Sequence, residues 1–124
     1  MARMKDTVFA SAARTTTANS SPFRCAAAGA RFFLEITAAS GSSPTLDLKA
    51  QVYDEVGENY HDLTGAGFAQ KTGTGNDYLV IRPGIGETSN EAVSDVMTGI
   101  YRVVAAIGGS SPSFTFTLHA EYQN

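Results

Sequence analysis

Two histidines are the side chains of this 124-residue chain best suited to acid–base chemistry or metal binding. His61 lies between Tyr60 and Asp62 beside a turn signal, whereas His119 lies in an alternating apolar segment. Neighbouring side chains on a strand point to opposite faces, so His61 and Asp62 make a poor catalytic dyad. No spacing in the sequence brings both histidines to a carboxylate, as a metal site would require. We therefore interpret both histidines as surface side chains.

Cys25 is the single cysteine, which excludes an intrachain disulfide and a zinc site built on several cysteines. Three alanines follow it and no base partner is identifiable, so we expect a small buried thiol rather than a nucleophile. The turn at 54–59 fails the EF-hand pattern, and the Gly- and Thr-rich segment 71–76 lacks the Walker sequence. We predict no enzymatic activity, no metal and no cofactor.

The composition describes a globular protein with few charges. Hydrophobic residues make up 43% of the chain and charged residues 17%, below the usual value of about 25%. The net charge is −3 and the nine Lys and Arg residues are scattered, which argues against binding to nucleic acid. The apolar runs are far shorter than the roughly 20 residues of a membrane helix. Residues 1–6 lack the apolar core of a Sec signal, so we expect synthesis and folding in a cytoplasm.

Alternation of apolar and polar residues is the main structural signal. In segment 45–53, Leu46 and Leu48 point one way while Asp47 and Lys49 point the other, as in a strand with one face on a core. Similar patterns predict strands over 7–17, 31–37, 60–63, 78–82, 100–107 and 113–120. Segment 65–77 is expected to be a loop or an irregular edge strand. The core is expected to contain Leu46, Leu48, Phe114 and Phe116.

One segment has helical features. Thr88 and Glu91 have capping-box spacing, and Val93, Val96 and Met97 follow at helical spacing. This pattern predicts a short helical turn near 88–97. The remaining elements predict an all-β, single-domain antiparallel β-sandwich or jelly roll. Residues 1–17 would form an N-terminal arm or a first strand, and residues 18–124 the sandwich domain.

The chain contains an internal duplication. Residues 32–52 align with residues 100–120, and the tetrapeptide 41–44 (Gly-Ser-Ser-Pro) matches 109–112 without a gap. Each copy reads strand, Gly-Ser-Ser-Pro, strand, so the copies are predicted to form equivalent hairpins or equivalent corners between two sheets. Simple architecture is the preferred explanation, because these turn residues carry no chemistry. The alternative is that the two loops lie at one end and contact a partner.

Several runs resemble a pattern of small proteins encoded by tailed phages and prophages. They are the run 37–49, the turn 54–59 with the following segment 60–63, the run 67–70 and the closing segment 101–116. The resemblance covers residues 7–122, with Tyr60 in place of the Trp expected in many relatives. It implies a small β-sandwich virion protein of the head decoration, or cement, type.

The resemblance also implies a location and partners. Such a protein would lie on the outer capsid surface, bind the major capsid protein and form a homo-oligomer, with a trimer as the first expectation. Its N-terminal arm would pair with a neighbour's sheet or form a strand of its own domain. The expected contact residues are Val8, Phe9, Arg14, Thr15, Thr16, Thr17, Ser42, Ser43, Ser110 and Ser111.

Two other functions remain as alternatives. The first is a phage tail or baseplate module that binds host-surface glycans. The absence of tryptophan argues weakly against it, although five tyrosines remain. The second is a small hydrolase with His61 or His119 as its base, for which the sequence contains no recognised catalytic spacing.

Overall fold

The computed structural model describes residues 4–123, and these form strands and no helix. The all-β prediction is therefore confirmed. None of the described residues belongs to a helix that could cross a membrane. The strands are β1 (Met4–Arg14), β2 (Ala18–Asn19), β3 (Phe23–Ala27), β4 (Gly29–Asp54), β5 (Asn59–Gly67), β6 (Gly75–Ile81), β7 (Ala92–Val93) and β8 (Met97–Gln123).

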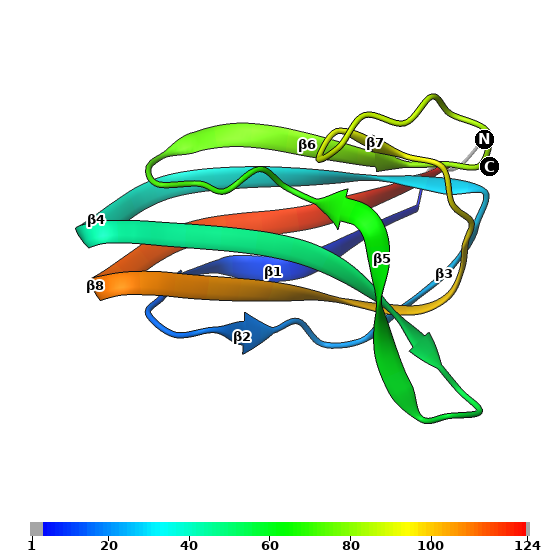
Figure 1. The fold of residues 1–124 in the computed structure, drawn as a ribbon, viewed down its shortest axis with the longest axis horizontal. Coiled ribbons are helices and arrows are strands. Elements are labelled where there is room, and N and C mark those ends of the chain that lie inside the picture. The colour runs from blue at the N-terminus through cyan, green and yellow to red at the C-terminus, as the bar shows by residue number, and fades with distance from the viewer. Residues whose placement is uncertain (1–3, 124) are drawn as a thin grey trace.

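Two very long strands organise the molecule. β4 and β8 pair antiparallel along almost their whole length, from Gly29 opposite Gln123 to Val52 opposite Tyr101. Figure 1 shows both strands folding back at the same end, which gives the paired strands two layers. In one layer, β1 lies beside the second half of β8 and β6 beside the first half of β4. In the other layer, β2 and β3 lie beside the first half of β8, and β5 beside the second half of β4.

The core fills the space between the two layers. Period-two alternation sends every second side chain inward along both long strands, so the apolar residues of each layer face those of the other. Leu46, Phe114 and Phe116 are fully buried and Leu48 is 2% exposed, which confirms the predicted core. The same cluster contains Phe32, Leu34, Leu79, Ile81, Tyr101, Val103 and Leu118.

The two Gly-Ser-Ser-Pro segments are corners, one of the two alternatives that the duplication left open. Each lies inside a long strand, where Gly41 and Gly109 have φ angles of 111° and 110°. Ser43 and Ser111 have φ angles of 48° and 47°. Ser42 pairs with Ser110 between the two bends. The corners are thus related by an approximate two-fold axis through that pair, so the duplicated sequence forms duplicated geometry.

The predicted helical turn near 88–97 is wrong. Thr88 and Ala92 exchange backbone hydrogen bonds of 3.0 and 2.9 Å around a tight turn. β7 then pairs with β6 in parallel, which also makes the sheet mixed rather than wholly antiparallel. The Val80 N–H donates to the Glu91 carbonyl at 3.0 Å, a bond outside any helix. So short a segment cannot offset the cost of helix nucleation, and pairing with β6 satisfies its backbone instead.

The N-terminal segment is a strand of its own domain. β1 pairs with β8 of the same chain, from Met4 opposite Tyr122 to Arg14 opposite Phe114. β1 covers residues 4–14 of the segment 1–17, and residues 1–3 lie outside the described residues. Segment 65–77, predicted as a loop or an irregular edge strand, is strand at its two ends, because β5 extends to Gly67 and β6 begins at Gly75.

The corner glycines provide a direct test of this architecture. A Cβ at Gly41 would lie 2.6 Å from the Ser111 carbonyl oxygen, and one at Gly109 would lie 2.6 Å from that of Ser43. We expect Gly41→Ala and Gly109→Ala each to lower the free energy of unfolding by about 1–3 kcal/mol. Gly73→Ala, where nothing lies within 4 Å, should have little effect in the same urea titration. Unequal losses at the two corners would contradict their symmetry.

The buried face of β4 gives a second test. Leu48→Asp places an unpaired carboxylate in the core, and we expect it to abolish soluble expression. Ala38→Asp, at an exposed position of the same strand opposite Thr115, is the matched control and should express normally. A well-folded Leu48→Asp protein, judged by its circular dichroism, would mean that the strand faces the other way.

Candidate functional site

The side chains best suited to catalysis lie apart from one another. His61 is exposed, with its Nε2 3.9 Å from Asp54 Oδ2, and Asp62 accepts hydrogen bonds from Lys49 and Gln51 instead. His119 is exposed on β8. Residues 4–123 contain no group of three or more His, Cys, Asp or Glu side chains that could hold a metal ion. The two histidines are surface side chains, as predicted.

The buried ionisable groups are held in their neutral forms. Cys25 is 2% exposed, and burial raises the pKa of its thiol, the opposite of what a nucleophilic cysteine requires. Burial also raises the pKa of Tyr101 to about 12, and its hydroxyl donates to the Val96 carbonyl at 3.2 Å. The pKa of Tyr122 is raised by burial and by the hydrogen bond that its hydroxyl donates to Asp6. These groups therefore contribute to packing.

Most of the predicted contact residues gather at one end of the molecule. The connection 15–17 runs beside the corner of β8, because Arg14 pairs with Phe114 and the Ile107 N–H donates to Thr17 Oγ1 at 3.2 Å. The β4 corner lies directly against the β8 corner. We call this surface the corner end, and Figure 1 shows it opposite the start of β1 and the finish of β8. Its exposed hydroxyl side chains are Thr15, Thr16, Thr17, Ser42, Ser43, Ser110 and Ser111.

Val8 and Phe9, also predicted as partner contacts, belong instead to the core. They are 9% and 4% exposed and belong to the core cluster, at a point where the pairing of β1 with β8 has an irregularity between Thr7 and Phe9. The Phe9 ring packs edge-on against Phe116, with the ring centroids 5.3 Å apart. These two side chains therefore offer little surface to a partner.

Arg14, a further predicted contact, is bound largely within its own domain. The pairing of β1 with β8 has a bulge between Phe9 and Ala12, and the Arg14 guanidinium lies 4.8 Å from the ring centroids of both Phe9 and Phe116. Its Nη2 donates to the Ala10 carbonyl at 2.8 Å. Partial burial lowers the pKa of this arginine from its usual value. Arg14 thus stabilises the irregular part of β1.

A polar network covers the outer face of the layer that contains β5. Arg102 donates to Gln51 Oε1 at 2.7 Å, and Gln51 donates to Asp62 at 2.8 Å. Asp62 also pairs with Lys49 at 3.1 Å, and hydrogen bonds from Gln51 and Lys49 lower its pKa. The Arg102 guanidinium lies 3.8 Å from the centroid of the Tyr60 ring. These side chains satisfy one another's hydrogen bonds and charges, as expected on a sheet surface that faces water.

The outer face of the other layer contains a row of rings. Phe33 pairs with Tyr78 of β6 on one side and with His119 of β8 on the other. The centroid distances are 6.2 Å and 5.8 Å. Together with Leu34, Glu35, Asn76 and Asp77, these residues line an open depression of about 440 Å³. The ring row was not predicted, because its members come from three separate strands. The one signal in the sequence that could have indicated the ring row was the outward position of Phe33 between the inward-facing Phe32 and Leu34.

Comparison with known proteins finds no relative: no family model, curated protein or solved structure matches the chain. The corner end and the depression beside the ring row are therefore defined by the geometry of this chain alone. The first presents hydroxyls and backbone, and the second presents rings and polar side chains.

The role of Arg14 can be measured. We expect Arg14→Ala to lower the free energy of unfolding by about 1–2 kcal/mol, because it removes the contacts with two rings and bonds to backbone carbonyls. Arg14→Lys should recover only part of this loss, since lysine lacks the planar guanidinium. Arg24→Ala, at an exposed position of β3, is the control. Equal urea midpoints for Arg14→Ala and Arg24→Ala would show that Arg14 does not stabilise β1.

Proposed function

We propose that this protein is a phage capsid decoration, or cement, protein, which binds the outer surface of the head and stabilises the shell by protein–protein contacts. The observation that carries the proposal is the corner end. There, the described residues present an uncharged surface of Ser and Thr hydroxyls and strand backbone.

The chemistry of the corner end supports contact with another protein. Hydroxyl groups are cheaper to remove from water than charges, and they re-form hydrogen bonds with a partner's backbone. The low charge of the whole chain, 17% of residues, agrees with this kind of surface. A partner would therefore gain contacts at a small desolvation cost.

The close packing of the two corners against each other supports the same function. Each corner packs against the other so closely that a Cβ on either glycine would clash with the opposite backbone. A surface that is already ordered loses little conformational entropy on binding, so more of the contact energy appears as affinity.

The proposed mechanism is mechanical. Each copy would bind the major capsid protein across a seam between subunits, and copies joined in a closed oligomer, with a trimer as the starting model, would add their modest contacts. The protein would then be a virion component on the capsid surface, without catalysis, cofactor, nucleic acid or membrane in its action. In this proposal β1 pairs in its own domain and leaves the corner end to make the contacts.

The alternative of a tail or baseplate module that binds host glycans is favoured by one observation. The depression beside the ring row combines aromatic and polar side chains, the combination expected of a saccharide site. None of the residues that line this depression belongs to the corner end.

Co-sedimentation with capsids of the encoding phage tests the decoration proposal. We expect saturable binding that prefers expanded to unexpanded shells, with a fixed number of copies per capsid subunit. Ser42→Lys and Ser110→Lys should weaken this binding by about tenfold or more, because each places a charge in an uncharged contact.

Ser89→Lys, in the exposed turn before β7, is the control and should bind like the unmodified protein. Absence of binding to heads, together with recovery of the protein in purified tails, would contradict decoration. Unchanged binding by both corner variants would contradict the corner end as the contact surface.

A further inference from the structure

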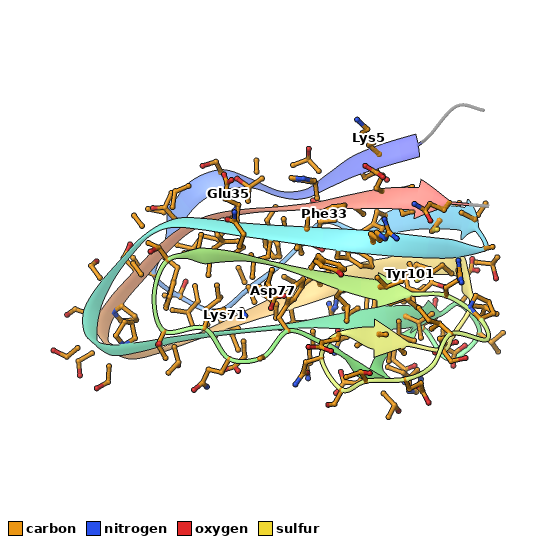
Figure 2. The ribbon with its side chains drawn as sticks, turned by 90° about the horizontal axis from the view of Figure 1, so that it is seen from above. Lys5, Phe33, Glu35, Lys71, Asp77 and Tyr101 are labelled. Carbon is orange, nitrogen blue, oxygen red and sulfur yellow. The ribbon has the colours of Figure 1, made fainter. Side chains whose placement is uncertain are left out.

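The depression on the outer face of β4, β6 and β8 has no role in the proposed capsid contact. We propose that it binds a neutral sugar ring of a saccharide, with the row His119–Phe33–Tyr78 as the platform. Figure 2 shows Phe33 and Glu35 on β4, near Asp77 and its partner Lys71. The proposal does not depend on the decoration function.

The ring row lines part of an open depression. The Phe33 ring is tilted by 33° to Tyr78 and by 32° to His119, so adjacent rings are closer to parallel than to perpendicular. Tyr78 is 55% exposed, although aromatic side chains of this size are usually covered. One face of a pyranose presents aliphatic C–H groups, which pack against aromatic faces. A platform of this shape therefore fits the apolar face of a sugar.

Polar side chains lie where the hydroxyls of that sugar would need partners. Glu35 and Asn76 are directly opposite each other on β4 and β6, and neither side chain has a hydrogen bond or ion pair within residues 4–123. A carboxylate accepts bonds from two neighbouring hydroxyls, and an amide both donates and accepts. Glu35 and Asn76 can thus bind the polar edge of a ring that stacks on the platform.

Charge in the depression favours a neutral ligand. Asp77 Oδ2 accepts a 2.6 Å hydrogen bond from Lys71 Nζ, and Asp77 Oδ1 accepts the Tyr78 N–H at 2.8 Å, so this carboxylate is already satisfied. Glu35 would repel a phosphate or a carboxylate. Attraction of a quaternary ammonium ion to these exposed rings is weak, because they form an open row and do not enclose the ion. A sugar without charge satisfies all of these conditions.

The position of the depression lets both binding events occur together. Phe33 precedes Gly41 along β4, and the extended strand between them spans roughly 25 Å. A ligand on the ring row would therefore leave the corner end uncovered. A capsid-bound copy would keep its sugar site available on a different face.

Amide chemical-shift mapping of the intact protein tests this inference. The probes are the methyl glycosides of glucose, galactose, mannose and N-acetylglucosamine, each added to about 50 mM, because a single ring on an open platform binds with millimolar affinity. We expect at least one glycoside to shift amides of residues 33–35, 76–78 and 117–119 in a saturable manner. Absence of such shifts with all four glycosides would overturn the proposal.

Two variants and one control identify the contact. Tyr78→Ala and Glu35→Ala should each weaken glycoside binding by about tenfold, through lost stacking and lost hydrogen bonds respectively. Val96→Ala is the matched control, because Val96 is 54% exposed and lies outside the depression. Equal binding by Tyr78→Ala and Val96→Ala would overturn the proposal. Shifts of the same amides by tetramethylammonium chloride, with no shift by any glycoside, would also overturn the proposal. Neither result depends on capsid binding.

Discussion

The pairing of β4 with β8 is the interaction on which the rest of the structure depends. β1, β2 and β3 take their hydrogen bonds from β8, β5 and β6 take theirs from β4, and only β7 pairs elsewhere, with β6. The pair can fold into two layers only because Gly41 and Gly109 let each backbone approach the other's serine carbonyl. A side chain at either position would oppose the bend that brings the two apolar faces together.

This arrangement separates the surfaces of the molecule by chemistry. The bend creates an end that presents Ser and Thr hydroxyls, one outer face is covered by a saturated polar network, and the other outer face contains an open row of rings. Each surface is held on regular strands whose inward side chains form one core, so its groups have defined positions. The buried thiol and tyrosines are held in their neutral forms and pack within the core.

Some structural features could be predicted from the chain because they are local. Alternation assigned Leu46, Leu48, Phe114 and Phe116 to the core, and all four are buried. The duplicated Gly-Ser-Ser-Pro segment indicated equivalent bends. The prediction of a helical turn near 88–97 was wrong, because helical spacing of only three apolar residues is weak evidence for a helix. Backbone bonds from β6 satisfied the segment in a different way.

The sequence by itself determined which side chains face inward, because a period of two follows from strand geometry alone. Only the tertiary structure decided which strands became neighbours. Whether the repeats formed hairpins or corners, and whether His119, Phe33 and Tyr78 met in one row, depended on register between distant segments. Register is set by the sum of many long-range contacts across two layers. No local pattern contains that sum, so the ring row became visible only in the folded chain.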